Sequence, residues 1–142
     1  MKRIFVNEKW CLGCRLCEYN CAFANKGGQT MYLALKNAVI HPNIKVEEKD
    51  GITYAVSCRH CTEPLCKKSC IAGAIKIVDG VVEIDKSKCV GCYTCVSVCP
   101  YGALSIGDNG VMQKCELCIS NGNGSPACVK GCPNQAIVYE ER

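Results

Sequence analysis

The feature that most constrains this chain is a run of four cysteines between Cys89 and Pro100, C-V-G-C-Y-T-C-V-S-V-C-P. Its spacing, C-x2-C-x2-C-x3-C-P, is the spacing that holds a cubane 4Fe–4S cluster. Three thiolates separated by two residues each can wrap a tight loop around one face of such a cluster. The fourth, Cys99, lies one helical turn beyond Cys95 and in this motif ligates a second cluster. The run therefore predicts another cysteine group elsewhere in the chain.

The chain supplies three further groups, and the four together use all 16 cysteines of its 142 residues. The groups are Cys11, Cys14, Cys17 and Cys21; Cys58, Cys61, Cys66 and Cys70; Cys89, Cys92, Cys95 and Cys99; and Cys115, Cys118, Cys128 and Cys132. The second group has a gap of four residues before its third cysteine, and the fourth group has a gap of nine. All sixteen cysteines are therefore candidate iron ligands.

A disulfide framework is the first alternative use of so many cysteines. The N-terminal stretch M-K-R-I-F-V-N-E-K-W has no apolar signal region, so export is not expected. In a cytoplasmic chain, cysteines bind metals more often than they form disulfides. No window approaches the roughly 18 apolar residues of a membrane span. We therefore expect a cytoplasmic metal protein without a membrane span.

Zinc is an alternative metal, since Cys-x2-Cys pairs also build zinc ribbons, and a net charge of +4 would then suggest nucleic-acid binding. However, the first and third groups are overlapping triplets, and Lys and Arg are scattered, so no nucleic-acid partner is expected. A nucleophilic cysteine is a weaker alternative, because no cysteine is left over and His41 and His60 show no base-and-orienter pattern. No Gly-rich nucleotide motif follows a strand. The chain by itself is not expected to be an enzyme.

Short elements are expected between the cysteine groups. They are a strand over residues 4–6, a helix over 29–38 with Met31, Leu35 and Ala38 on one face, a hairpin over 44–57, a hairpin of 75–78 with 81–84, a turn over 105–111 and a loop over 119–127. Asp79-Gly80 predicts a type I′ turn for the second hairpin.

A short repeat follows the fourth cysteine of three groups. The segments are I-A-G-A-I-K-I after Cys70, P-Y-G-A-L-S-I after Cys99 and P-N-Q-A-I-V-Y after Cys132. Each predicts a turn that leads from a cluster ligand into a strand. Cys21 is followed instead by A-F-A-N-K-G-G. The repeat favours a duplicated unit in which one copy is split around the other.

The two histidines and several basic residues are interpreted as supporting residues. We expect His41 to be an ordinary loop residue and His60 a partly exposed loop side chain. The sharper alternative for His60 is a hydrogen bond towards a cluster sulfur that raises the reduction potential. Basic side chains near the candidate ligands are expected to compensate buried negative charge, and the alternative for those that are exposed is electrostatic steering of a partner. They are Arg15, Lys67, Lys68, Lys114 and Lys130.

Residues 57–106 resemble a complete bacterial two-cluster ferredoxin. The four groups together, with the C-x2-C-x4-C-x3-C second group and the long gap in the fourth, resemble the four-cluster electron-transfer subunits of complex oxidoreductases. That family includes the iron–sulfur subunits of formate dehydrogenase and dimethyl sulfoxide reductase. It also includes the small subunits of CO dehydrogenase systems and of tungsten aldehyde ferredoxin oxidoreductases. In its compactness, this chain resembles these small subunits more closely.

The resemblance implies an α+β fold, a duplicated ferredoxin-like fold in which an inner unit (residues 57–106) is inserted into an outer unit (residues 1–56 and 107–142). It also implies four 4Fe–4S clusters with nested ligation, in which each group lends its fourth cysteine to another group. The implied ligand sets are Cys11, Cys14, Cys17 and Cys132; Cys115, Cys118, Cys128 and Cys21; Cys58, Cys61, Cys66 and Cys99; and Cys89, Cys92, Cys95 and Cys70.

The implied function is the relay of single electrons through four clusters, between a catalytic oxidoreductase subunit and a redox partner. The catalytic subunit would be of the CO dehydrogenase or aldehyde oxidoreductase type. The redox partner would be a flavin-containing NAD(P)H oxidoreductase subunit or a soluble ferredoxin. The alternative is a free polyferredoxin that carries electrons between enzymes by diffusion.

Overall fold

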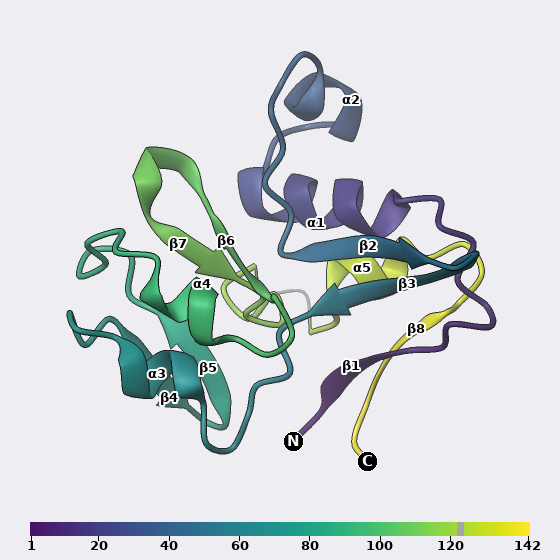
Figure 1. Ribbon diagram of the computed structural model, residues 1–142. Coiled ribbons are helices and arrows are strands. Elements are labelled where there is room, and N and C mark those ends of the chain that lie inside the picture. The colour runs from purple at the N-terminus through teal and green to yellow at the C-terminus, as the bar shows by residue number, and fades with distance from the viewer. Residues whose placement is uncertain (122–123) are drawn as a thin grey trace.

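The computed structural model of the chain describes residues 1–121 and 124–142. Within them, short helices alternate with four two-stranded antiparallel sheets, a mixed α+β architecture (Figure 1). The sheets pair β1 (Arg3–Val6) with β8 (Ile137–Glu140), β2 (Ile44–Lys49) with β3 (Ile52–Ser57), β4 (Ile75–Val78) with β5 (Val81–Ile84), and β6 (Leu104–Ile106) with β7 (Met112–Lys114). No described helix is long and apolar enough to cross a membrane.

Four helices each carry the third cysteine of a group. They are α1 (Leu16–Lys26) with Cys17, α3 (Leu65–Ser69) with Cys66, α4 (Thr94–Val98) with Cys95, and α5 (Ala127–Lys130) with Cys128. The fourth cysteine follows one helical turn later. It ends the helix at Cys70 and Cys99, whereas α1 continues past Cys21. The helix end and the fourth cysteine therefore coincide in the second and third groups.

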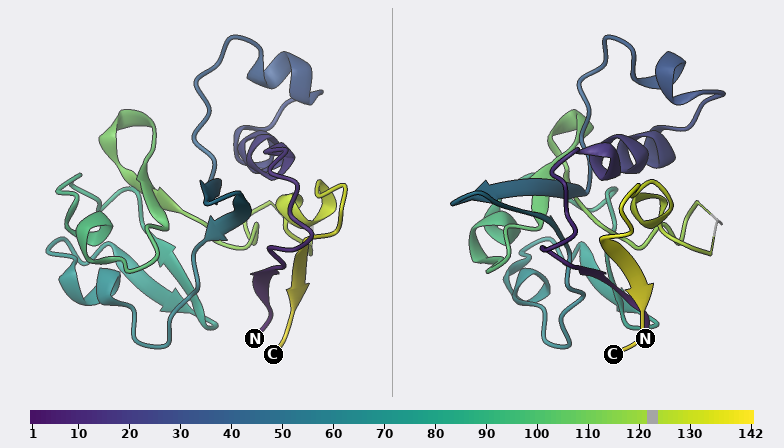
Figure 2. Two further views of the ribbon diagram at one scale, coloured as in Figure 1. Left: turned by 45° about the vertical axis from the view of Figure 1, so that its right-hand side comes forward. Right: turned by 90° about the vertical axis from the view of Figure 1, so that its right-hand side faces the viewer.

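The elements form two bodies, and one of them combines segments that are distant in the sequence (Figures 1 and 2). One holds α1, α5 and the sheets β1–β8 and β2–β3; the other holds α3, α4 and the sheets β4–β5 and β6–β7. Each body has its own hydrophobic core, and cysteines form part of both cores. Strand β5 lies between them, since Val81 belongs to the first core and the next residue, Val82, to the second.

The two ends of the chain lie side by side (Figure 2). Strand β1 pairs with β8 so that Ile4 lies opposite Tyr139. The backbone N–H of Asn7 continues the pairing by donating to the carbonyl of Ala136 at 2.8 Å. The strand predicted over residues 4–6 is confirmed, and its partner is the strand that follows the last cysteine.

Both predicted hairpins are confirmed. Asp79 and Gly80 have φ angles of 50° and 82°, the two positive values that a type I′ turn requires. In the other hairpin, the alternating Ile44 and Val46 of β2 are buried, but the buried residues of β3 are Ala55 and Ser57 rather than its alternating apolar residues. Val46 lies opposite Ala55 on the buried face, and Ile52 on the other face is 51% exposed. The register puts the small Ala55, rather than the larger alternating residues, against the core.

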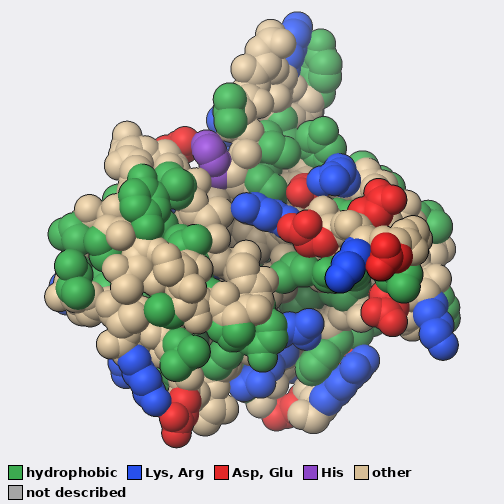
Figure 3. Space-filling model, in the orientation of Figure 1, with side chains coloured by type: hydrophobic (Ala, Val, Ile, Leu, Met, Phe, Trp, Pro, Cys, Tyr) green, Lys and Arg blue, Asp and Glu red, His purple; other side chains and the backbone are tan. Residues whose placement is uncertain are grey.

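The predicted turn over residues 105–111 lies between β6 and β7 and contains the short 3₁₀ turn Asp108–Gly110. Helix α2 (Met31–Leu35) is shorter than the predicted helix over 29–38. Its first turn is capped by the Thr30 hydroxyl, which accepts from Leu33 N–H at 3.2 Å. No residue of α2 is buried, and the segment projects from the body (Figures 1 and 3). The predicted loop over 119–127 includes residues 122–123, which lie outside the described residues.

Candidate metal centres

The first two cysteines of every group are joined by the same backbone turn. The residue before the second cysteine has a positive φ in all four groups, with values of 67° at Gly13, 48° at His60, 71° at Gly91 and 58° at Leu117. The N–H groups of His60 and Leu117 each donate to the Sγ of the group's first cysteine at 3.4 Å. His60 and Leu117 hold a conformation that costs an L-residue roughly 1–2 kcal/mol. The surrounding structure therefore imposes this turn at those two positions.

A second shared turn follows the fourth cysteine of three groups. The N–H groups of Gly73, Gly102 and Gln135 each donate to the carbonyl of that cysteine at 3.3 Å. All three residues have positive φ, and a strand begins two residues later. In two of the turns, the next N–H group donates to the cysteine Sγ at 3.3 Å, from Ala74 and from Ala136. The turn predicted from the sequence repeat is thus a real structural repeat.

Cys21 has different surroundings, as its different sequence suggested. It lies within α1, and its Sγ accepts from the backbone N–H of Asn43 at 3.3 Å and from the Asn25 side chain at 3.6 Å. N–H groups that point at a thiolate stabilise its charge. The sulfur is thus supplied with donors even without the turn.

The structure brings the cysteines together in sets that mix the groups. Around one hollow lie Cys11, Cys14, Cys17 and Cys132; around others lie Cys70, Cys89, Cys92 and Cys95; Cys58, Cys61, Cys66 and Cys99; and Cys21, Cys115 and Cys118, with which Cys128 interacts electrostatically. In each set, one cysteine comes from a group distant in the sequence. All sixteen thiols are unpaired.

The donor chemistry of these sets fits iron–sulfur clusters, because four cysteine thiolates are the ligands of a 4Fe–4S cubane. Among the described residues, no three Cys, His, Asp or Glu side chains converge closely enough to hold a single metal ion. The thiols stand instead around hollows. A single zinc ion would draw thiolates to Zn–S distances of about 2.3 Å, whereas a cluster of eight atoms keeps them farther apart.

Electrostatic interactions between sets place the hollows in a row. The set of the first group interacts with that of the fourth through the charges of Cys17 and Cys128. The set of the fourth group interacts in the same way with that of the second through Cys115 and Cys58. The set of the second group interacts with that of the third through Cys66 and Cys95. At the two ends of the row, Cys14 and Cys92 are exposed.

Burial strongly affects the acidity of the inner thiols. It raises the pKa of Cys17 and of Cys115 to about 12, and that of Cys128 still further. At the surface, hydrogen bonds from Thr94 instead lower the pKa of Cys92. Because metals bind thiolates, metal binding at the buried positions would release protons.

The expectation that His60 is a partly exposed loop side chain is wrong, because the residue is only 1% exposed. Val82 N–H donates to its Nδ1 at 3.1 Å. Burial, and then the charges of Lys114 and Arg3, lower the pKa of His60 to about 3. The neutral ring therefore carries its proton on Nε2, which has no partner among the described residues. The hydrogen bond to a cysteine sulfur comes from the backbone N–H of His60 and goes to Cys58, whereas the ring makes none to a described cysteine.

Lys114 is the one Lys or Arg that is buried among the described residues, at 2% exposure. Its Nζ donates to the carbonyl of Cys115 at 2.8 Å. By contrast, the exposed Arg15 and Lys68 form ion pairs with Glu18 and Glu63. Burial of Lys114 was not apparent from the sequence, in which it is one of several basic residues near cysteines. His41 lies in its expected loop, where its Nε2 is 3.4 Å from an Asp108 oxygen.

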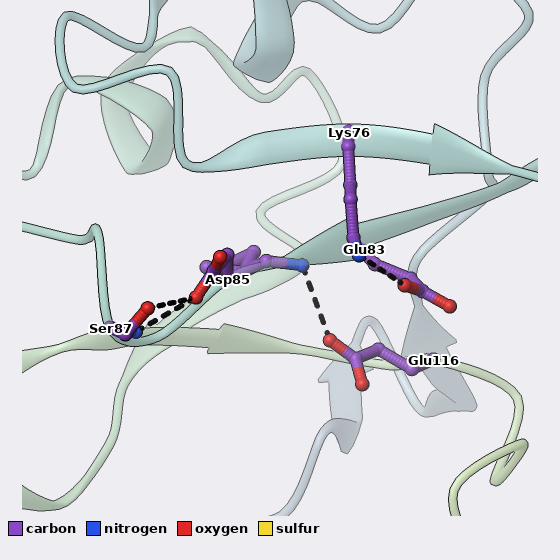
Figure 4. Close-up of polar contacts among 6 residues, drawn as sticks. Lys76, Glu83, Asp85, Ser87 and Glu116 are labelled. Carbon is purple, nitrogen blue, oxygen red and sulfur yellow. Dashed lines mark hydrogen bonds and ion pairs between the residues drawn. The ribbon is translucent and has the colours of Figure 1, made fainter.

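Two acidic residues accept hydrogen bonds from backbone N–H groups next to the third and fourth cysteine groups (Figure 4). The Glu116 side chain follows Cys115 and accepts from the N–H of Ile84 on β5 at 3.2 Å. Asp85 accepts from the backbone N–H of Ser87 at 3.0 Å and so shapes the turn that enters the third group. Ile84 ends β5 and Asp85 follows it directly, so the end of this strand is linked to cysteines of both groups.

Comparison with known proteins matches residues 50–142 to the family "4Fe-4S dicluster domain". The chain is 38% identical to the "Iron-sulfur protein" of Rhodospirillum rubrum, over 94% of this chain and 79% of that protein. It is 32% identical to "Electron transport protein HydN" of Escherichia coli (strain K12), over 98% of this chain and 87% of that protein.

A solved structure supports the same relationship. The chain matches "Active site complex BamBC of Benzoyl Coenzyme A reductase as isolated" with a TM-score of 0.54 and 25% sequence identity, over 100% of this chain and 78% of that one. The family match covers more than half of the chain and includes three of its four cysteine groups. The chain therefore belongs to the 4Fe–4S dicluster domain family of iron–sulfur electron-transfer proteins.

Proposed function

We propose that this chain holds four 4Fe–4S clusters and is the electron-transfer subunit of an oxidoreductase complex. The observation that carries the proposal is the exchange of fourth cysteines, which puts Cys132 beside the first group and Cys99 beside the second. When bound, each cluster would accept and donate one electron. The ligands would be the four mixed sets of cysteines described above, and they use all sixteen thiols.

The residues around the hollows have separate tasks in this proposal. N–H groups of His60, Leu117, Ala74 and Ala136 would stabilise ligand thiolates by hydrogen bonds. Burial would hold water away from the two middle sites, while Cys14 and Cys92 leave the two end sites accessible. Such a row can face a catalytic subunit at one end and a redox partner at the other.

We also propose the inserted arrangement of two ferredoxin-like units, the outer one formed by residues 1–56 and 107–142. The separate hydrophobic cores and the β1–β8 pairing support it. Met112 belongs to the second core and to the β6–β7 sheet, which favours extending the inner unit, residues 57–106, through β7. Two similar units, each with two clusters, would then share the four sets.

For the partner, we propose a catalytic subunit of the CO dehydrogenase or tungsten aldehyde oxidoreductase type, in the cytoplasm. The match to a chain of the BamBC active-site complex supports a place beside a catalytic subunit. The redox partner would be a flavin-containing NAD(P)H oxidoreductase subunit or a soluble ferredoxin. The second candidate function, a diffusing polyferredoxin, is favoured by the exposure of both end sites, which suits transient encounters.

The test of the proposal is metal analysis of anaerobically purified protein. Four cubanes require about 16 iron and 16 acid-labile sulfide per chain. Stoichiometric zinc without sulfide would overturn the cluster assignment, and about eight iron would reduce it to two clusters.

Anaerobic affinity purification from the source cells then separates the two candidate functions. A subunit is recovered with its catalytic enzyme at constant stoichiometry, whereas a diffusing carrier is recovered alone.

A further inference from the structure

The buried side chain of Lys114 has no counter-charge among the described residues. Its side chain is buried at the end of β7, and its one hydrogen-bond acceptor is the neutral carbonyl of Cys115. Within residues 1–121 and 124–142, no carboxylate forms an ion pair with it. The nearest acidic neighbour in the chain, Glu116, accepts instead from the N–H of Ile84. A buried ammonium is strongly destabilised unless a nearby negative charge compensates it, and no described carboxylate does so.

The surroundings of Lys114 indicate where that negative charge belongs. Lys114 itself lines the hollow of Cys21 and Cys115, and its strand partner Leu104 lines the hollow of Cys66. Its charge also lowers the pKa of the Cys66 and Cys115 thiols, against the effect of their burial. Cys66 lies in the hollow with Cys58 and Cys99, and Cys115 lies in the hollow with Cys21. These are the two middle hollows of the row. Lys114 thus stands between the two sites that contain no exposed cysteine.

We propose that Lys114 is a fixed positive charge shared by the two middle clusters, and that it makes both of them easier to reduce than they would be without it. A cluster bound by four thiolates is anionic and gains one more negative charge on reduction, so a nearby ammonium stabilises the reduced form more than the oxidised form. Lys114 is a positioning residue for charge and not a ligand. The inference rests on the proposed cluster assignment.

The size of the effect follows from Coulomb's law. For charges about 10 Å apart at an effective dielectric constant of about 20, the interaction is on the order of a tenfold change in an equilibrium constant. A tenfold change corresponds to about 59 mV for a one-electron couple. The end clusters, near the exposed Cys14 and Cys92, are more distant along the row and better screened.

The test is a potentiometric titration, followed by electron paramagnetic resonance, of intact protein with its full iron and sulfide content. We expect Lys114→Met to disfavour reduction of two of the four clusters by about tenfold each. Lys114→Arg keeps the charge and should preserve the wild-type potentials. Lys67→Met is the matched control, because Lys67 adjoins the ligand position Cys66 but is exposed to solvent; it should shift no potential appreciably.

Unchanged reduction potentials in fully loaded Lys114→Met would overturn this inference but not the proposed function. An equal shift of all four potentials, or equal shifts in Lys114→Met and Lys114→Arg, would do the same. Lack of clusters in the wild-type protein would overturn the proposed function as well. If Lys114→Met does not bind its full iron and sulfide content, the test is nuclear magnetic resonance of the wild-type protein labelled with ¹⁵N at lysine Nζ. We expect one slowly exchanging ammonium resonance, absent from Lys114→Arg, that shifts on reduction more than those of the other lysines. A neutral amine at this position contradicts the inference.

Discussion

Cys132 lines the same hollow as Cys14, although the two residues lie near opposite ends of the chain. The β1–β8 pairing produces this relationship by placing the strand before the first group beside the strand after the last group. The first cysteine group is therefore joined by a cysteine of the fourth group. An N-terminal fragment with Cys11, Cys14 and Cys17 alone would lack the fourth thiol.

Cys132→Ala should therefore open the site of the first group and not that of its own group. We expect the iron content to fall from about 16 to about 12 per chain, the loss of one cubane. Anaerobic alkylation followed by mass spectrometry should then label Cys11, Cys14 and Cys17, while Cys115 stays protected. The matched variant Cys21→Ala should give the reverse labelling. Labelling of Cys115 in Cys132→Ala would show that ligation is local to each group.

The parts of this structure that could be predicted from the sequence depend on local signals. The Asp79-Gly80 turn forms because both of its residues tolerate positive φ. The turn after Cys70 and Cys99 could be predicted because Gly73 and Gly102 stand where the backbone needs a left-handed residue. The hairpin and strand positions follow from the same kind of signal.

The features that escaped prediction depend on how the two bodies meet. His60 stands in the turn position that Gly occupies in two other groups, and only the packing of β5 shows that its ring is buried against Val82. Burial of Lys114 likewise depends on tertiary contacts around Cys115. Helix α2 is short because none of its residues is buried, so tertiary packing does not extend it.

Gly91→Ala should destabilise the holo-protein more than Gly102→Ala. Both glycines have positive φ, which costs an L-residue roughly 1–2 kcal/mol. An added Cβ at Gly102 would meet nothing within 4 Å, whereas at Gly91 it would lie 2.7 Å from the backbone oxygen of Gly110. That contact adds about 1–3 kcal/mol of overpacking.

The measurement is the rate at which the visible cluster absorbance is lost on anaerobic heating, because unfolding of such proteins is a kinetic quantity. We expect Gly102→Ala to shorten the half-life moderately and Gly91→Ala to shorten it much further. Equal half-lives would mean that the loop of residue 110 moves aside without cost, and that only the backbone conformation matters.

Cluster loading should become weaker as the pH falls from 9 to 5. The ordinary pKa of a cysteine thiol is 9.0, and burial raises that of Cys17 and Cys115 to about 12 in the metal-free fold. These thiols are therefore protonated throughout this range, and each must release a proton to become a ligand. Linkage then disfavours loading by about 1.4 kcal/mol per pH unit for each proton released, without a plateau.

The measurement is competition for iron with a chelator whose own protonation is corrected for, read from cluster absorbance at several pH values. Retention should fall steeply at low pH. A pH-independent competition would mean that the metal-free thiols are already ionised, against the effect of their burial.

The holo-protein should behave as an anion although its sequence is basic. The side chains give a formal net charge of +4, and the sequence has a pI of about 8.3 with its cysteines largely neutral. An oxidised 4Fe–4S core of about +2 with four thiolates contributes about −2, so four clusters contribute about −8. The loaded chain is then near −4, and nearer −8 when every cluster has gained an electron.

Native isoelectric focusing without oxygen measures this change directly. The holo-protein should focus well below the metal-free chain and should bind an anion exchanger near neutral pH. The metal-free protein is the control, since it differs only in the clusters and the thiol protons that they displace. Two clusters instead of four would leave the charge near zero, so the focusing position also counts clusters. A holo-protein that focuses above pH 8 would contradict both the charge assignment and the number of clusters.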